Sequence, residues 1–305
     1  MKSAVILNAA AGSDPGRGDT SEADRVRAAF QRAGLEAIVT APEPDAFEAA
    51  VRDAVGSDAD IVVLGGGDGT LSAGAAAMVG GAKPLGVLPL GTLNHFAKDV
   101  GIPADLDAAV ETIRAGQVMD VDVGEVNGRI FLNNSSIGLY PMAVKEREEL
   151  RHRSGGGKWL AMLRASADVF RRFPLLEVTL PLEGREVRLT TPFVFVGNNR
   201  YEMSLLTLGS RASLQGGELS VYVPRHGSRL GLLQLAFRAL LGRLDQERDF
   251  HSTAVPSIEI HTRRRSLRVS LDGEVAQMTS PIRFLIRPRA LRVLAPLRAR
   301  EGAEA

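Results

Sequence analysis

The chain has no cysteine among its 305 residues, few aromatic residues and no long apolar run. Without cysteine it can form neither a disulfide framework nor a zinc–thiolate site. Aromatic residues make up 5% of the chain, and no motif interleaves them with basic residues, which disfavours a nucleic-acid-binding protein. No run approaches the ~18 apolar residues of a membrane span, and the run at 4–7 is too short for a signal peptide. These absences predict a soluble cytoplasmic protein.

The net charge of +1 conceals two parts of opposite sign. Residues 1–124 carry 9 lysines and arginines against 18 aspartates and glutamates, a net charge of −9. The remaining residues carry 28 against 18, a net charge of +10. Such asymmetry predicts that the second part faces an anionic surface, either nucleic acid or membrane. The alternative is a basic surface that is merely solvated.

The first part of the chain alternates between strand and helix patterns. Apolar runs of strand length lie at 3–7, 35–40, 60–64 and 85–90. Thr20 or Ser21 can cap the helix that follows the first run. Strands alternating with helices predict a parallel sheet covered on both faces, whose ligand lies at the carboxyl ends of the strands. The loops at Asn8, Thr40, Gly65 and Gly91 should therefore converge on one ligand.

The most informative stretch is Gly65-Gly66-Gly67-Asp68-Gly69-Thr70, between a buried strand and a helix. Glycines let backbone N–H groups approach an anion, and a helix N-terminus adds positive potential, so this turn predicts a phosphate site. An acid in such a turn indicates phosphoryl transfer with a divalent cation. The alternative is a plain tight turn with an N-capping aspartate. The stretch lacks the Gly-Lys-Ser/Thr ending of a Walker loop and follows the third strand, unlike a Rossmann fingerprint.

From residue 118 onward the sequence alternates with period two, as in β-strands. Asn127-Gly128, Glu183-Gly184 and Asp272-Gly273 are typical of hairpin turns. Further strand-like runs lie at 176–182, 186–190, 192–196, 219–223, 257–261, 267–271 and 282–286. This part is predicted to be antiparallel and mostly β, interrupted by helical segments near 142–173 and 228–243.

Four blocks in this order resemble the diacylglycerol kinase catalytic family: Gly66-Gly67-Asp68-Gly69-Thr70, Gly91-Thr92-Leu93-Asn94, Asp122-Val123-Gly124 with the later Asn133–Gly138 stretch, and Asp272-Gly273-Glu274. The family includes bacterial soluble lipid kinases and sphingosine kinases and is more distantly similar to NAD kinases. The resemblance covers nearly the whole chain. It implies an α/β ATP-binding domain at 1–124, completed by 291–305, and a mostly antiparallel β-sandwich lipid-substrate domain at 125–290, with a cleft between them.

The resemblance also implies roles for individual residues. Glu274 matches the proton acceptor of the family. The alternative is that Glu274 is only a solvated acid at a hairpin. Asp68 and Asp122 match acids of the catalytic and magnesium network, although Asp122 could form an exposed pair with Asp120. The implied ATP-binding residues are Asn8, Ala9, Ala10, Ala11, Gly12, Thr40, Gly65, Gly66, Gly67, Asp68, Gly69, Thr70, Leu71, Ser72, Thr92 and Asn94.

Two departures from the family pattern affect the metal. His95 stands where the family often has an acid, and it is expected to be a polar residue at a helix terminus rather than a catalytic one. Gly216-Gly217-Glu218 stands where the family often has Asp-Gly, so Glu218 is the substitute candidate for a magnesium ligand.

The resulting functional prediction is an ATP- and Mg²⁺-dependent kinase for a hydroxyl of diacylglycerol or a similar lipid. The alternatives are a kinase for a sphingoid base or soluble nucleotide, and a catalytically silent lipid or nucleotide sensor. The lipid is expected at a membrane surface to which the protein binds peripherally, with no nucleic-acid partner; homodimer formation is left open.

Two basic segments fit interfacial helices, and core-facing amphipathic helices are the alternative. The first surrounds the one tryptophan, and the second combines an apolar helical face with arginines. The first comprises Lys145, Arg147, Arg151, His152, Arg153, Lys158 and Trp159, and the second Arg229, Leu230, Leu233, Phe237, Arg238, Leu240, Leu241 and Arg243.

Overall fold

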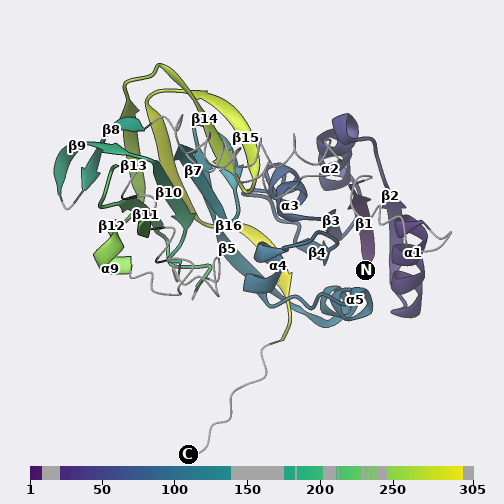
Figure 1. The fold of residues 1–305 in the computed structure, drawn as a ribbon. Helices are drawn as coiled ribbons and strands as arrows, with labels where there is room; N and C mark the ends of the chain where they lie inside the picture. The colour runs from purple at the N-terminus through teal and green to yellow at the C-terminus, as the bar shows by residue number, and fades with distance from the viewer. Residues whose placement is uncertain are drawn as a thin grey trace, which may run out of the picture. The chain divides into compact units, whose positions relative to one another are not determined.

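The computed structural model describes residues 1–8, 21–138, 175–182, 184–201, 211, 213–228, 231, 234–235, 238 and 246–297. The chain forms two compact units (Figure 1). Unit 1 comprises residues 1–123, 213–217 and 287–305, and unit 2 comprises 124–212 and 218–286.

Unit 1 contains the predicted parallel sheet. Its strands are β1 (Lys2–Leu7), β2 (Glu36–Thr40), β3 (Ile61–Gly66) and β4 (Leu85–Pro89), in the order β2-β1-β3-β4. Strand β3 is buried along its whole length, as expected for the centre of a sheet covered on both faces. The long strand β16 (Ile282–Ala295) adds its last part beside β4, where Val293 pairs with Leu85 in parallel register.

Helices cover both faces of this sheet (Figure 1). Helices α1 (Glu22–Arg32) and α5 (Leu106–Ala115) pack against each other, and so do α2 (Phe47–Gly56) and α3 (Asp68–Ala75). A 3₁₀ turn, η1 (Pro44–Ala46), precedes α2, and the short helix α4 (His95–Val100) follows β4. Ser21 caps α1, as one of the two predicted candidates, because its Oγ accepts a 3.2 Å hydrogen bond from the Asp24 N–H. The predicted α/β architecture is confirmed.

Unit 2 is built from antiparallel strands around a large apolar core, with a smaller aromatic cluster of Tyr201, Tyr222 and Phe250 beside it. A six-stranded sheet has the order β12-β11-β10-β7-β14-β15. Its members are β7 (Asn134–Gly138), β10 (Phe193–Asn198), β11 (Leu219–Pro224), β12 (Phe250–Val255), β14 (Ser266–Leu271) and β15 (Glu274–Thr279). Strand β13 (Ser257–Thr262) pairs with the first part of β16 and with β8 (Leu176–Leu182), which pairs with β9 (Arg185–Thr191). The core includes residues from both groups of strands, so the antiparallel β architecture predicted for this part is confirmed.

Two predicted hairpins have the expected backbone. Strand β5 (Gln117–Val126) turns through Asn127 (φ 46°) and Gly128 (φ 84°) into β6 (Arg129–Phe131). Strand β14 turns through Asp272 (φ 47°) and Gly273 (φ 94°) into β15. Positive φ at both central residues is the requirement of the tightest hairpin turns, which asparagine, aspartate and glycine meet most readily.

Several predictions differ from the structure or lie outside it. Strand β12 and the short helix α9 (Gln246–Asp249) were not predicted, and β16 is one strand where two segments were expected. The predicted helix near 142–173, with its basic residues and Trp159, lies outside the described residues, as does most of the 228–243 segment. Within the described parts of the chain, no helix is both long and apolar enough to span a membrane.

Candidate functional site

The glycine-rich turn of unit 1 lies against the loops that the sequence predicts to meet it. Asn8, directly after β1, donates its backbone N–H to the Gly65 carbonyl (3.0 Å) and its side-chain amide to the Thr70 hydroxyl (2.8 Å). The turn also touches the second predicted loop, since a Cβ built on Gly91 would lie 2.4 Å from Gly67 Cα. The approach requires glycine at position 91, whereas a Cβ built on Gly67 would lie 3.5 Å from Gly91 Cα, an ordinary contact. The loops after β1, β3 and β4 are therefore brought together.

Helix α3 presents its N-terminus at this place. Its N-cap residue is Gly67, which has no side chain to accept a bond from the first turn. Gly69 and Thr70 are half-buried, while Leu71 is fully buried in the core and Ser72 nearly so. Backbone N–H groups of a first helical turn can donate hydrogen bonds to an anion. The Leu71 side chain packs inward and its N–H donates to the Gly67 carbonyl (3.0 Å), so its role as a nucleotide ligand stays a prediction.

Asp68 is a helix cap, but for a helix other than its own. Its Oδ2 accepts the backbone N–H of His95 (3.1 Å) and its Oδ1 accepts that of Phe96 (2.9 Å). These are the first two residues of α4, whose N-cap residue Asn94 makes no capping bond. The alternative, an aspartate that caps the helix following the turn, does not hold for α3, whose N-cap is Gly67; Asp68 caps α4 instead. The predicted magnesium role of Asp68 stays a prediction beside this structural one.

Asn94 shapes the second loop from inside. It is 8% exposed and has a left-handed backbone (φ 50°). Its side-chain oxygen accepts the Gly91 N–H (3.0 Å), and its amide donates to the carbonyls of Pro89 (3.0 Å) and Gly91 (2.7 Å). Thr92, in the same loop, is exposed. Of these two predicted nucleotide ligands, Thr92 has the accessible side chain, and Asn94 holds the loop that carries it.

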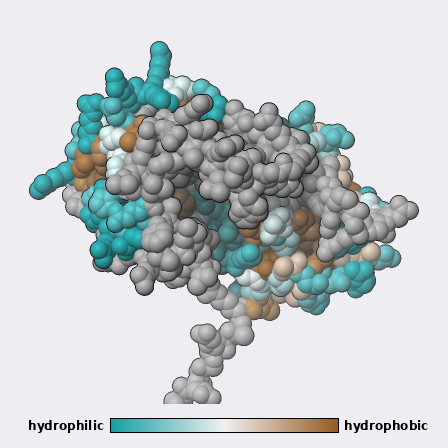
Figure 2. All heavy atoms as spheres, viewed as in Figure 1, coloured by the Kyte–Doolittle hydropathy of each residue, from teal (hydrophilic) through white to brown (hydrophobic). Residues whose placement is uncertain are grey.

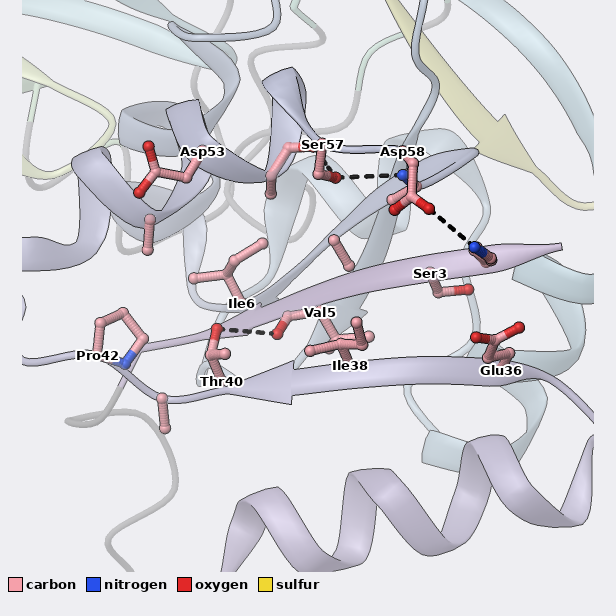
Figure 3. A pocket seen from close by; sticks show the side chains of 16 residues that line it. Ser3, Val5, Ile6, Glu36, Ile38, Thr40, Pro42, Asp53, Ser57 and Asp58 are labelled. Atoms are coloured by element: carbon pink, nitrogen blue, oxygen red, sulfur yellow. Dashed lines mark hydrogen bonds and ion pairs between the residues drawn. The ribbon is translucent and has the colours of Figure 1, made fainter.

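Thr40 lies at one end of a groove of about 830 Å³ in unit 1 (Figure 3). The groove runs between α2 and strands β1 and β2. Ile38 is 70% exposed on its floor, and Asp53, Ser57 and Asp58 lie along the α2 side. The Thr40 hydroxyl donates to the Val5 carbonyl over 3.4 Å, so it faces β1. The remaining predicted ligands 9–12 lie outside the described residues.

Asp122 is 1% exposed and joins three segments of unit 1. Its Oδ2 accepts the Gly217 N–H (2.7 Å), and its Oδ1 accepts the Arg289 N–H (2.8 Å). The alternative of an exposed pair is therefore wrong for Asp122, although its neighbour Asp120 is exposed and lies 3.7 Å from Arg292. Burial of a carboxylate requires such partners, because an unpaired charge is costly in the interior.

Glu274 is the first residue of β15 in unit 2 and is exposed. It pairs in register with Leu271 across the Asp272-Gly273 turn. Glu218, the other acid predicted in this unit, binds Arg200 Nε through its Oε1 at 2.7 Å. Among the residues that the structure describes, no three histidine, aspartate or glutamate side chains form a group that could hold a metal ion. The magnesium roles of Asp68, Asp122 and Glu218 stay predictions.

Comparison with known proteins agrees with this arrangement. The family profile described as the diacylglycerol kinase catalytic domain matches residues 2–126. That of the YegS C-terminal NAD kinase beta sandwich-like domain matches 138–295, about half of the chain. A Pseudomonas aeruginosa protein named probable lipid kinase YegS-like is 32% identical over 276 residues, which are 88% of each chain. This chain belongs to the diacylglycerol kinase catalytic family.

Other relatives of this family member extend the comparison. The Bacillus subtilis protein named diacylglycerol kinase is 26% identical to it over 88% of each chain. The crystal structure of a diacylglycerol kinase from Bacillus anthracis covers 96% of each chain with a TM-score of 0.67 and 20% identity, which supports the fold. The family is one of lipid kinases, and the predicted resemblance is confirmed.

The sequence did not point to Arg211. It is 8% exposed, and its guanidinium donates to carbonyls and to an amide oxygen of unit 2. The ring of Tyr201 lies 5.6 Å from its guanidinium carbon. A lone arginine outside any regular strand or motif carries no local signal, so its partners could be found only in three dimensions.

Proposed function

We propose that this member of the family is an ATP-dependent kinase that transfers the γ-phosphate to a hydroxyl of diacylglycerol or a similar lipid. The observation that carries the proposal is the packing of the glycine-rich turn against Gly91. At this contact Gly67, the N-cap residue of α3, meets Gly91, and neither residue has a side chain. That arrangement suits a polyphosphate better than an uncharged ligand. The names of the relatives favour a lipid as the acceptor.

In this proposal unit 1 binds the nucleotide. The first turn of α3 and Asn8 lie nearest the phosphates, and Thr92 adds an accessible hydroxyl. The groove that begins at Thr40 takes the base, because its floor is apolar and its rim carries hydrogen-bonding groups. Residues 9–12 complete the nucleotide set predicted from the sequence.

Magnesium fits this proposal through Asp68. Mg²⁺ usually binds one or two carboxylates together with substrate phosphates, so it does not need a cage of protein ligands. The half-buried Asp68 carboxylate, at the phosphate turn, is a hard oxygen donor of the required kind. When bound, the ion supplies neutralisation of phosphate charge. We assign Asp122 and Glu218 as more distant members of the same acidic network.

Unit 2 supplies the base in this proposal. The lipid hydroxyl oxygen forms a bond to the γ-phosphorus, the bond from that phosphorus to the β-phosphate oxygen breaks, and ADP leaves. The hydroxyl proton passes to the Glu274 carboxylate. A positioned carboxylate contributes roughly 10²–10⁴-fold to such a step. Exposure of Glu274 at the end of a hairpin is compatible with access for a lipid hydroxyl.

Peripheral binding to an anionic membrane is assigned to the basic side of unit 2. Arg264, Arg265 and Arg268 are exposed near the turn between β13 and β14. Arg188 and Arg263 both bind Glu177 (3.0 and 3.1 Å), and they hold the pKa of that carboxyl below its usual value, with the hydrogen bond from Arg188 as the largest cause. Figure 2 shows hydrophilic side chains, with some hydrophobic ones between them, over the part of unit 2 labelled β8 and β9 in Figure 1.

One assay tests the proposal against its alternatives. The purified chain is incubated with γ-labelled ATP and micelles that contain diacylglycerol, a sphingoid base or neither lipid, and with a soluble nucleotide acceptor in a fourth arm. We expect label in the diacylglycerol arm and its loss in Asp68→Asn. Label confined to another acceptor would replace the substrate, and ATP binding without transfer in any arm would favour the sensor.

A further inference from the structure

A buried polar cluster in unit 2 surrounds the connection between β6 and β7. Arg211 Nη1 donates to the Leu132 carbonyl (2.6 Å) and to the Asn198 carbonyl (3.2 Å). Its Nη2 donates to the Asn133 side-chain oxygen (2.9 Å). Asn198 adds a side-chain bond to the same Leu132 carbonyl (2.8 Å). Arg211, a residue that is 8% exposed, is thus held by two oxygen atoms of the connection and by one carbonyl of β10.

Asp272 binds the other side of this connection. Its Oδ2 accepts the Leu132 N–H (2.6 Å), and its Oδ1 accepts the N–H groups of Asn133 (2.8 Å) and Asn134 (2.9 Å). The Asp272 backbone N–H returns a bond to the Asn134 carbonyl (2.9 Å). Hydrogen bonds to an ionised acceptor are about twice as strong as neutral ones. Four bonds therefore fasten one turn residue to three consecutive residues about 140 positions earlier.

One peptide group joins the two charges. The peptide between Leu132 and Asn133 receives Arg211 at its carbonyl and offers its N–H to Asp272. Its dipole therefore lies between a cation at the oxygen end and an anion at the nitrogen end, the orientation that both charges favour. Hydrogen bonds in such a chain polarise and strengthen one another in a low-dielectric interior. Arg211 and Asp272 form an ion pair bridged by a peptide group.

The second hairpin of the same type provides a contrast. Asn127 has the same left-handed backbone, and its amide both donates to the Thr279 carbonyl (3.2 Å) and accepts from the Arg283 N–H (2.8 Å). A neutral amide suffices there because its partners are of both kinds. At Asp272 the side chain accepts three backbone N–H groups, those of residues 132, 133 and 134, and all three are donors. An asparagine would turn its own N–H₂ toward one of them, so only a carboxylate satisfies this place.

We propose that Asp272 and Arg211, through the peptide between residues 132 and 133, are positioning residues for Glu274. Glu274 follows Asp272 by two residues across a tight turn and begins strand β15. Fixing that turn fixes the point from which the Glu274 side chain leaves the backbone. This inference rests on the proposed role of Glu274 as the base. A displacement of about 1 Å in a reacting group can cost roughly 10²-fold in rate.

A double-mutant cycle on the full chain tests this inference. We expect Asp272→Asn to lower the kcat of lipid phosphorylation by roughly 10- to 100-fold, with the KM for ATP changed less than about 2-fold. In the Glu274→Gln background the same change should add little, because the group that it positions is already lost. Arg211→Lys, which keeps the charge and loses the fork of donors, should give a smaller loss that also disappears in that background. Asn127→Asp in the other hairpin is the matched control and should leave kcat unchanged.

Amide hydrogen exchange gives a second readout that does not depend on activity. Exchange at the Asn133 amide should accelerate in both Asp272→Asn and Arg211→Lys, and it should stay slow in Asn127→Asp. The positioning role is wrong if Asp272→Asn lowers kcat by the same factor in the Glu274→Gln variant as in the parent chain. It is also wrong if hydrogen exchange at the Asn133 amide is unchanged. Normal turnover by Glu274→Gln alone would instead refute the proposed base, and the positioning role with it. If Asp272→Asn does not fold, the Arg211→Lys cycle and its exchange rates decide.

Discussion

The Asp68 carboxylate binds the backbone N–H of His95 across 27 positions of sequence, with 3.1 Å between oxygen and nitrogen. Asp68 belongs to the first turn of α3, and His95 is the first residue of α4. The acid in the glycine-rich turn therefore holds the second loop in place. The presence of an acid in this turn has a structural reason in addition to the cation that we propose it binds.

Asp68→Asn should separate these two contributions. The amide oxygen can still accept one N–H, so we expect a stability loss of about 0.5–2 kcal/mol, typical of a lost cap. We expect kcat to fall by roughly 10²–10³-fold, as when a preorganised electrostatic group is removed. Asp105→Asn is the matched control, because Asp105 caps α5 through the Ala108 N–H (3.0 Å). Urea unfolding and lipid turnover measured on both variants decide, and equal turnover losses would assign Asp68 to structure alone.

Glu274→Gln should reduce transfer without weakening nucleotide binding. The carboxamide keeps the shape of the side chain and cannot take the proton, so lipid phosphorylation should fall by roughly 10²-fold or more. Glu218→Gln is the comparison, since that carboxylate is already bound to Arg200 and is expected to tolerate the change better. ATP affinity by calorimetry and turnover by label transfer are measured separately. A loss of ATP affinity in proportion to activity would remove Glu274 from the role of base.

Asp122→Asn should lower the free energy of unfolding of unit 1, although it replaces only one oxygen atom by an amide group. Both carboxylate oxygens accept backbone N–H groups, so an amide leaves one donor facing another. We expect a loss of about 1–3 kcal/mol, the cost of an unsatisfied buried group. Asp120→Asn, two residues away and exposed, should stay within about 0.5 kcal/mol of the parent. Mg²⁺ titration of the surviving activity then tests the metal role, which an unchanged Mg²⁺ dependence would contradict.

Reversing charge at the turn between β13 and β14 should weaken membrane binding. For Arg264→Glu with Arg265→Glu we expect reduced sedimentation with vesicles rich in anionic lipid and little change with neutral vesicles. Salt should weaken binding of the parent chain, since charges are screened beyond about 8 Å at physiological ionic strength. Arg52→Glu with Arg114→Glu, on helices of unit 1, makes the same change in net charge. If both double variants lose binding equally, the effect is one of net charge and the turn is not the contact surface.

The sequence predicted what depends on neighbouring residues. Asn127-Gly128 and Asp272-Gly273 were identified as hairpin turns because their backbone requirement is met within two residues. The alternation of strands and helices predicted the parallel sheet in the same way. Strand β12 was missed because its burial alternates while its residue types do not: the half-buried positions include His251 and Thr253, and an exposed one holds Ala254.

What the sequence could not give depends on partners far along the chain. Asp120 and Asp122 look alike in an alternating strand, and only the bonds to Gly217 and Arg289, 95 and 167 positions away, bury one of them. The cap that Asp68 provides for α4 is likewise a contact between residues far apart in the sequence. The glycine motif predicted a turn for phosphate, but no local rule connects position 68 with the N–H groups of residues 95 and 96. The nucleotide, base and magnesium assignments stay predictions until the experiments above are done.

The strand β16 has a consequence for how the polypeptide matures. Its last part pairs with β4, and residues 289, 290 and 292 bind Asp122, Gly80 and Ala82 of unit 1. A ribosome therefore finishes the N-terminal unit only after it has synthesised the whole of the other one. Until then β4 has an unpaired edge, which invites pairing with another nascent chain. A fragment cut at residue 124 for expression would keep that open edge permanently.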